Sequence, residues 1–76
     1  MVFYRAIIGT EDRQIVSARN TELLRDAEEI AESWQRKMLG KESGYGVLAW
    51  VAVQKLEKEL TAIGVDLWQT VSEFEF

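Results

Sequence analysis

The sequence predicts an α+β fold, in which two helices cover one face of a three-stranded antiparallel sheet in the order β-β-α-α-β. Three observations support this prediction. Two segments rich in β-branched and aromatic residues flank a polar turn near the N-terminus. Residues 21–39 have the apolar period of a helix. The C-terminal segment alternates apolar and polar residues, as a strand does. A length of 76 residues indicates one domain spanning 1–76.

The first two strands are expected to form a hairpin. Residues 2–8, with the sequence VFYRAII, have the length and composition of a strand, and residues 14–18 resume a shorter one. The intervening residues 9–13 are polar and begin with glycine, which is typical of a turn.

The segment 21–39 is expected to be an amphipathic helix. Its apolar residues recur at the spacing of one helical face: Leu23, Ala27, Ile30, Ala31, Trp34 and Met38. We expect Thr21 to cap its N-terminus, because a threonine hydroxyl can accept a hydrogen bond from a free backbone N–H. Gly40 is expected to end it.

The segment 47–63 admits two interpretations. As a helix it has an apolar face formed by Ala49, Val53, Leu56, Leu60 and Ile63. Its first half is apolar on all sides, however, which is also typical of a buried strand. The helix is the main prediction, and a fourth strand over residues 47–53 is the alternative.

The segment 65–75 is expected to be the last strand, although its alternation changes phase. Val65, Leu67 and Val71 would lie on one side of a regular strand, with the aromatic residues Trp68, Phe74 and Phe76 on the other. Such a strand is either apolar on both faces or bulged near Ser72. The sequence does not decide which face is buried.

The second face of the predicted sheet bears more apolar side chains than one uncovered face can expose. It either binds a partner or a second copy, or is covered by long Glu, Arg and Gln side chains. The predicted contact patch comprises Trp50, Val47, Val51, Trp68, Phe74 and Phe76.

The predicted helix 21–39 carries a dense acidic face. Its carboxylates are Glu22, Asp26, Glu28, Glu29 and Glu32, interrupted by Arg25. Two hypotheses remain for this face: it is a solvated helix surface, or it binds the basic surface of a protein partner, with carboxylates in place of phosphates.

The composition argues against several functions. The chain has no histidine and no cysteine, so we expect no catalytic residue, no metal site and no cofactor. Its net charge of −4 argues against direct binding of nucleic acid. It has no apolar run long enough to span a membrane, and we expect a cytoplasmic location.

The size, the charge layout and the helical segment AEEIAESW resemble those of small inhibitors encoded by bacteriophages and mobile elements, including anti-CRISPR proteins. This resemblance implies a non-enzymatic protein that blocks the substrate site of a nuclease or a nucleic-acid-guided complex. The predicted function is therefore to bind and occlude a protein partner. The alternative is a structural homodimerising module without inhibitory activity.

Overall fold

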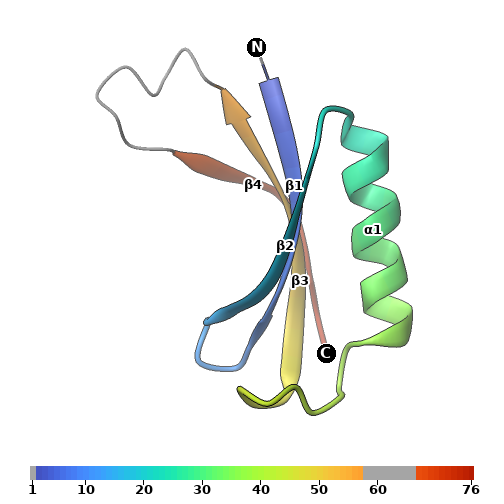
Figure 1. Ribbon diagram of the computed structural model, residues 1–76, viewed down its shortest axis with the longest axis vertical. Coiled ribbons are helices and arrows are strands. Elements are labelled where there is room, and N and C mark those ends of the chain that lie inside the picture. Colours follow the sequence, from blue (N-terminus) through green and yellow to red (C-terminus); the bar gives the residue numbers. More distant parts are fainter. Residues whose placement is uncertain (1, 58–66) are drawn as a thin grey trace.

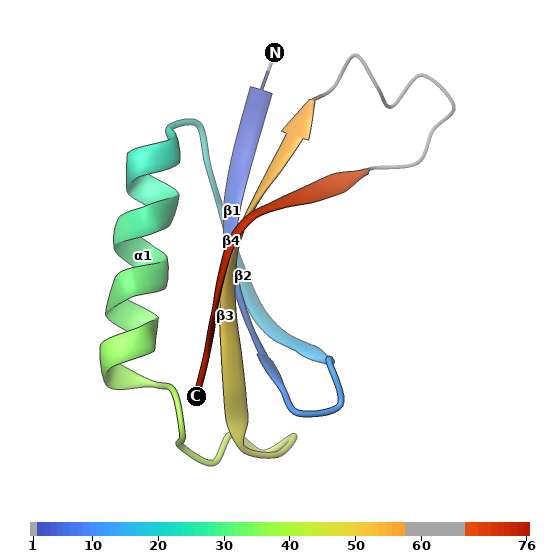
Figure 2. The same ribbon diagram turned by 180° about the vertical axis from the view of Figure 1, so that it is seen from behind.

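The computed structural model describes residues 2–57 and 67–76, which form one helix packed on a four-stranded antiparallel sheet. The elements in chain order are β1 (Val2–Thr10), β2 (Ile15–Thr21), α1 (Leu24–Lys37), β3 (Leu48–Glu57) and β4 (Trp68–Glu75). The strands are arranged in the order β2-β1-β3-β4. Figures 1 and 2 show α1 on one side of this twisted sheet. The opposite side, which no helix of the described residues covers, is called the open face below.

The prediction of three strands and two helices is wrong. Its alternative, a fourth strand at residues 47–53, agrees with the structure in the number of strands, although the observed strand is longer. Those residues belong mostly to β3, which lies between β1 and β4. Val51 and Val53 are buried toward α1, and Trp50 and Ala52 are buried on the open face. A central strand covered on both faces is apolar on all sides, which explains the ambiguous pattern. β3 continues to Glu57, and residues 58–63 of the predicted helix lie outside the described residues.

The helix begins later than the sequence suggested. Thr21 is the last residue of β2 and pairs with Tyr4, so it cannot cap α1. Its hydroxyl donates instead to the Leu23 carbonyl at 2.9 Å, and the N-cap residue Leu23 makes no side-chain capping bond. Thr21 therefore belongs to the sheet, and α1 begins after a short connection.

The core lies between α1 and the sheet. Ala27 and Ala31 of α1 are fully buried, and their small side chains let the helix backbone approach the strands closely. The buried residues of this core are Ala6, Ile8, Ala27, Ala31, Leu48, Val51 and Val53. Trp34 packs against this cluster from its margin and is only partly buried.

A β-bulge in β4 accounts for its irregular alternation. Val53 pairs with Ser72 and Gln54 with Thr70, so Val71 has no partner residue on β3. The extra residue moves Trp68 to the open face while Phe74 remains on the face of α1. Of the two interpretations of this strand, the bulge near Ser72 is confirmed. Residues 65 and 66 of the predicted strand lie outside the described residues.

Gly9 allows β1 to accommodate a large aromatic side chain on the open face. Gly9 pairs with Trp50 across the sheet. A Cβ atom at Gly9 would lie 2.4 Å from Cζ2 of Trp50 and 2.5 Å from the Gln14 carbonyl oxygen. Since the second contact is with backbone, the obstruction cannot be relieved by a side-chain rotation alone. Glycine is therefore required here for packing.

We predict that Gly9→Ala lowers the free energy of unfolding by about 1–3 kcal/mol, the usual cost of overpacking. Urea denaturation followed by circular dichroism measures this change. Gly44→Asn is the matched control, because a Cβ at Gly44 meets nothing within 4 Å and asparagine tolerates its φ of 53°. Equal stability of the two variants would contradict the packing role of Gly9.

Candidate functional site

Trp50 is buried on the open face by an arginine from the β1–β2 turn. The guanidinium carbon of Arg13 lies 4.2 Å from the centre of the Trp50 ring system, in cation–π geometry. Nη2 of Arg13 also lies 2.6 Å from Oε1 of Glu73 on β4. Together with Gly9, these contacts leave Trp50 only 5% exposed. The open face is thus closed over Trp50 without a second helix.

The turn holds Arg13 in place through backbone contacts. The Arg13 N–H donates to the Thr10 carbonyl at 2.9 Å, and the Thr10 N–H donates to the Gln14 carbonyl at 3.0 Å. Arg13 itself has a φ of 69°, a left-handed conformation that few non-glycine residues adopt. The indole N–H of Trp50 donates to the same Thr10 carbonyl at 2.8 Å. Turn and tryptophan therefore fix each other.

A second arginine covers the other end of the open face. The guanidinium carbon of Arg5 lies 4.2 Å from the centre of the Trp68 ring system, and its Nε donates to Oε1 of Gln54 at 2.8 Å. Nε2 of Gln54 donates in turn to the Thr70 hydroxyl at 3.3 Å. Between the two arginines, Ile7 is buried in one cluster with Trp50 and Ala52. Long polar side chains therefore lie over both tryptophans of the open face, while Ile15, which pairs with Gly9 on this face, stays 44% exposed.

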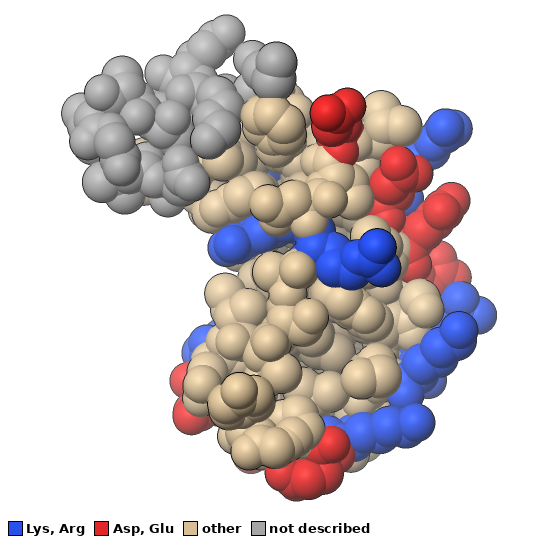
Figure 3. Space-filling model, in the orientation of Figure 1, with Lys and Arg blue, Asp and Glu red and all other residues tan. Residues whose placement is uncertain are grey.

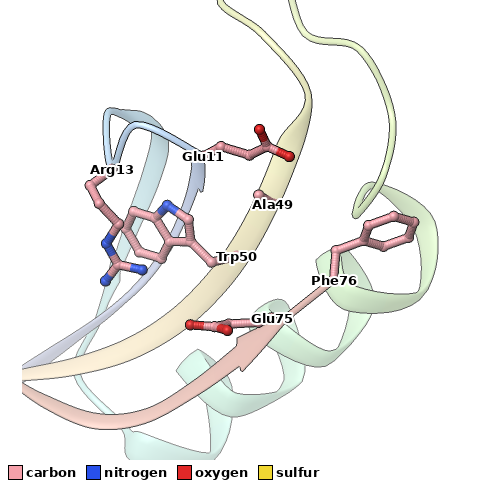
Figure 4. Close-up of a pocket in the computed structure, with 6 residues that line it drawn as sticks. All are labelled: Glu11, Arg13, Ala49, Trp50, Glu75 and Phe76. Carbon is pink, nitrogen blue, oxygen red and sulfur yellow. The ribbon is translucent and has the colours of Figure 1, made fainter.

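A shallow depression of about 260 Å³ lies beside Trp50 (Figure 4). Its lining residues are Glu11, Arg13, Ala49, Trp50, Glu75 and Phe76. Figure 4 shows Arg13 across the Trp50 ring, with Phe76 pointing away from both. Within residues 2–57 and 67–76 no three acidic side chains are grouped to hold a metal ion. Because the Arg13 guanidinium already contacts Glu73 and Trp50, the depression offers neither a metal site nor an uncommitted cation.

The six residues of the predicted contact patch do not form one surface. Trp50 and Val51 are buried, and Trp68 is half-buried under Arg5. Val47, Phe74 and Phe76 are exposed. The patch was predicted on the assumption that Trp50 lies on a helix, whereas β3 turns Trp50 and Val51 to opposite faces of a covered sheet.

Phe76, although 83% exposed, has a defined position beyond the end of β4. Its N–H donates to the Ala49 carbonyl at 2.8 Å. A Cβ atom at Gly40 would lie 2.6 Å from the Phe76 ring, so the ring rests on the backbone that follows α1. Phe76 therefore connects β4 to the end of the helix, and most of its ring remains exposed.

The acidic residues of α1 separate into two groups. Asp26 and Glu29 line a depression beside Arg19 of β2, and this pair is called the β2 flank. Glu28 and Glu32 line a groove beside β4, and this pair is called the β4 flank. Glu22 is exposed and precedes the helix. Figure 3 shows acidic atoms along the upper part of the side where α1 lies and basic atoms along its lower part.

The groove beside β4 has a volume of about 300 Å³ and lies over the edge of the core. We call it the β4 groove, and its lining residues are Glu28, Glu32 and Gln35 of α1, Val53 of β3, and Ser72 and Phe74 of β4. Val53 is fully buried, whereas Phe74 is 39% exposed. The groove thus joins an apolar strip to an acidic wall.

The sequence left open that long Arg and Gln side chains cover the second face, but it did not identify which ones do so. They are Arg5, Arg13 and Gln54. The sequence feature that could identify such residues is an arginine or glutamine in a strand or turn that strand pairing brings near an aromatic residue. The division of the acidic face depends on where β2 and β4 lie relative to α1, which no local pattern specifies.

Comparison with known proteins gives no relative: no protein-family model, curated protein or solved structure matches this chain. Among the described residues, α1 is too short and too polar to cross a lipid bilayer.

We predict that the carboxyl group of Asp12 titrates below its ordinary pKa of 3.8, because it accepts hydrogen bonds from the Thr10 hydroxyl and, more weakly, from the Gln14 N–H. A carboxyl group whose pKa is lower in the folded state stabilises the fold at pH values above its unfolded-state pKa. This stabilisation is lost as the pH falls through the folded-state pKa. Carbon-detected NMR of the Asp12 carboxyl against pH measures the midpoint.

Thr10→Val should raise the pKa of Asp12 toward its ordinary value, because the hydroxyl donor is removed. Thr10→Ser is the control, since it retains the hydroxyl. A midpoint for Asp12 that is the same in both variants would show that the Thr10 hydroxyl is not the cause of the shift.

Proposed function

We propose that this protein is a non-enzymatic binding protein that places the acidic side of α1 on a basic surface of a protein partner and occludes it. The observation that carries this proposal is that most carboxylates of α1 form no ion pair with the rest of the described chain. Among the described residues, Glu28, Glu29 and Glu32 form no ion pair with lysine or arginine. Asp26 has an exposed contact with Arg25 at 4.0 Å, which is worth little in water.

The number of carboxylates exceeds what the helix needs for its own stability. The helix dipole favours negative charge mainly in the first turn, where Asp26 lies. Glu28 and Glu32 are one turn apart and further along, so they repel each other by a few tenths of a kcal/mol. A basic partner would convert this repulsion into attraction. Binding therefore gives a physical reason for an arrangement that costs the isolated helix stability.

Occlusion follows from the chemistry of such a partner. A protein surface rich in lysine and arginine commonly holds nucleic acid, and a row of carboxylates can occupy the sites of its phosphates. We therefore propose a partner that binds nucleic acid, with a nuclease or a nucleic-acid-guided bacterial defence complex as the specific class. The shallow cavities of the described residues are consistent with a function of the surface rather than of an enclosed active site.

The proposal predicts that Glu28→Lys, Glu29→Lys and Glu32→Lys together weaken binding at least tenfold and flatten its salt dependence. The control combines Glu11→Lys and Glu42→Lys with Gln14→Lys and Tyr45→Lys, which changes the net charge equally at exposed positions away from both α1 and β4. Wild-type and both variants serve as baits for bacterial lysates, and quantitative mass spectrometry ranks the captured proteins. The affinity of the highest-ranked protein is then measured by calorimetry at two salt concentrations.

A partner captured by the wild-type and control baits, but lost with the α1 variant, is the expected result. If the two variants capture every protein equally well, the acidic side of α1 is not the binding surface.

A homodimerising module is the second candidate, because β2 and β4 both lie at sheet edges that no other strand covers among residues 2–57 and 67–76. We expect a monomer nevertheless, since the open face is covered and Glu73 and Glu75 of β4 would approach their own copies in a symmetric pairing. Size-exclusion chromatography with light scattering determines the mass. A stable dimer at micromolar concentration would favour the module over the inhibitor.

A further inference from the structure

The β4 groove is open on the side away from the core and is bounded by a free strand edge. β4 is the last strand of the sheet, and its outer edge has no neighbouring strand in the part of the chain that the structure describes. A free edge presents unpaired backbone N–H and C=O groups. The groove and this edge are adjacent, because Ser72 and Phe74 of β4 form one of its walls.

The charges around the groove are of one sign. Glu28 and Glu32 stand on its helix wall, and no lysine or arginine of residues 2–57 and 67–76 lines it. On the opposite face of β4, Glu75 is exposed and Glu73 has Arg13 as its ion partner. The β2 flank differs, because Arg19 lines the depression beside its carboxylates. The β4 groove is thus the less compensated of the two acidic flanks.

The same features argue against a second copy as the occupant. Two glutamates on an edge strand, Glu73 and Glu75, discourage pairing between identical edges because like charges would meet. Two copies joined at β4 would also bring their β4 flanks near each other. A basic strand meets none of this repulsion, because each of these carboxylates then faces a cation.

We propose that an extended, basic segment of the partner protein docks in the β4 groove and adds an antiparallel or parallel fifth strand to β4. In such pairing the backbone of the segment bonds to the free edge, and alternate side chains point to the same face. Lysine or arginine side chains on the helix side reach Glu28 and Glu32, and neighbouring apolar groups cover Phe74. This inference rests on the proposed function. It adds that the partner contacts the β4 flank and binds by strand addition.

The test uses NMR titration of the isotope-labelled protein with a short capped peptide in which lysine and valine alternate. The control peptide has the same composition but D-residues at alternate positions, which keeps the charge and prevents a regular strand. We expect the largest amide shifts in β4 and on the β4 flank, slower hydrogen exchange in β4, and binding about tenfold tighter than that of the control peptide.

Two double variants separate the flanks. Glu28→Lys with Glu32→Lys should weaken the alternating peptide about tenfold, whereas Asp26→Lys with Glu29→Lys should weaken it less than threefold. The net charge changes equally in both. Circular dichroism checks that each variant is folded, and the shift map of the wild-type protein provides a readout that needs no variant.

Each outcome decides a different point. Shifts in β4 together with loss of affinity in the β4-flank variant alone support the groove. Equal weakening by both variants, or equal binding of both peptides, overturns the groove while leaving the acidic helix as the binding surface. If neither variant changes the affinity, the proposed function fails as well. Concentration-dependent protection of β4 without peptide would identify a second copy as the occupant and overturn the inference.

Discussion

The structure depends on the burial of β3 on both of its faces. Toward α1, Val51 and Val53 meet a helix whose alanines allow close contact. On the open face there is no second helix among the described residues, and Trp50 is buried instead between Gly9 and the guanidinium of Arg13. An arginine and a glycine therefore bury this side of the sheet, whereas larger domains cover it with another layer of secondary structure.

This solution determines where the protein can present a binding surface. The open face has its aromatic rings covered by Arg5 and Arg13, and these cations are engaged by Gln54 and Glu73. Among the described residues, its two tryptophans are thus covered by arginines that are themselves engaged. The side of α1 is different, because its carboxylates have few partners and it borders a free strand edge. We therefore expect the side of α1, rather than the open face, to bind a partner.

Parts of the fold could be predicted from local pattern. The hairpin of β1 and β2, the amphipathic helix and the bulged last strand each have a period that a few neighbouring residues define. β3 could not be assigned in the same way, because burial on both faces removes its alternation. Val53 and Leu56 would share one face of a helix. In the strand, however, Val53 is buried on the face of α1 and Leu56 on the open face. Only the pairing partners decide between these possibilities.

The candidate site shows the same division between local and non-local information. The sequence specifies that Glu28, Glu29 and Glu32 lie on the polar side of a helix. It does not specify that Glu29 faces β2 and Arg19 while Glu28 and Glu32 face β4, because this follows from the position of α1 across the sheet. The bulge at Val71 likewise places Phe74 on the face of α1 and Trp68 on the open face, whereas a regular strand would place both on one face. One inserted residue thus brings an aromatic side chain to the same groove as two unpaired carboxylates, and the groove combines apolar and electrostatic recognition as a result.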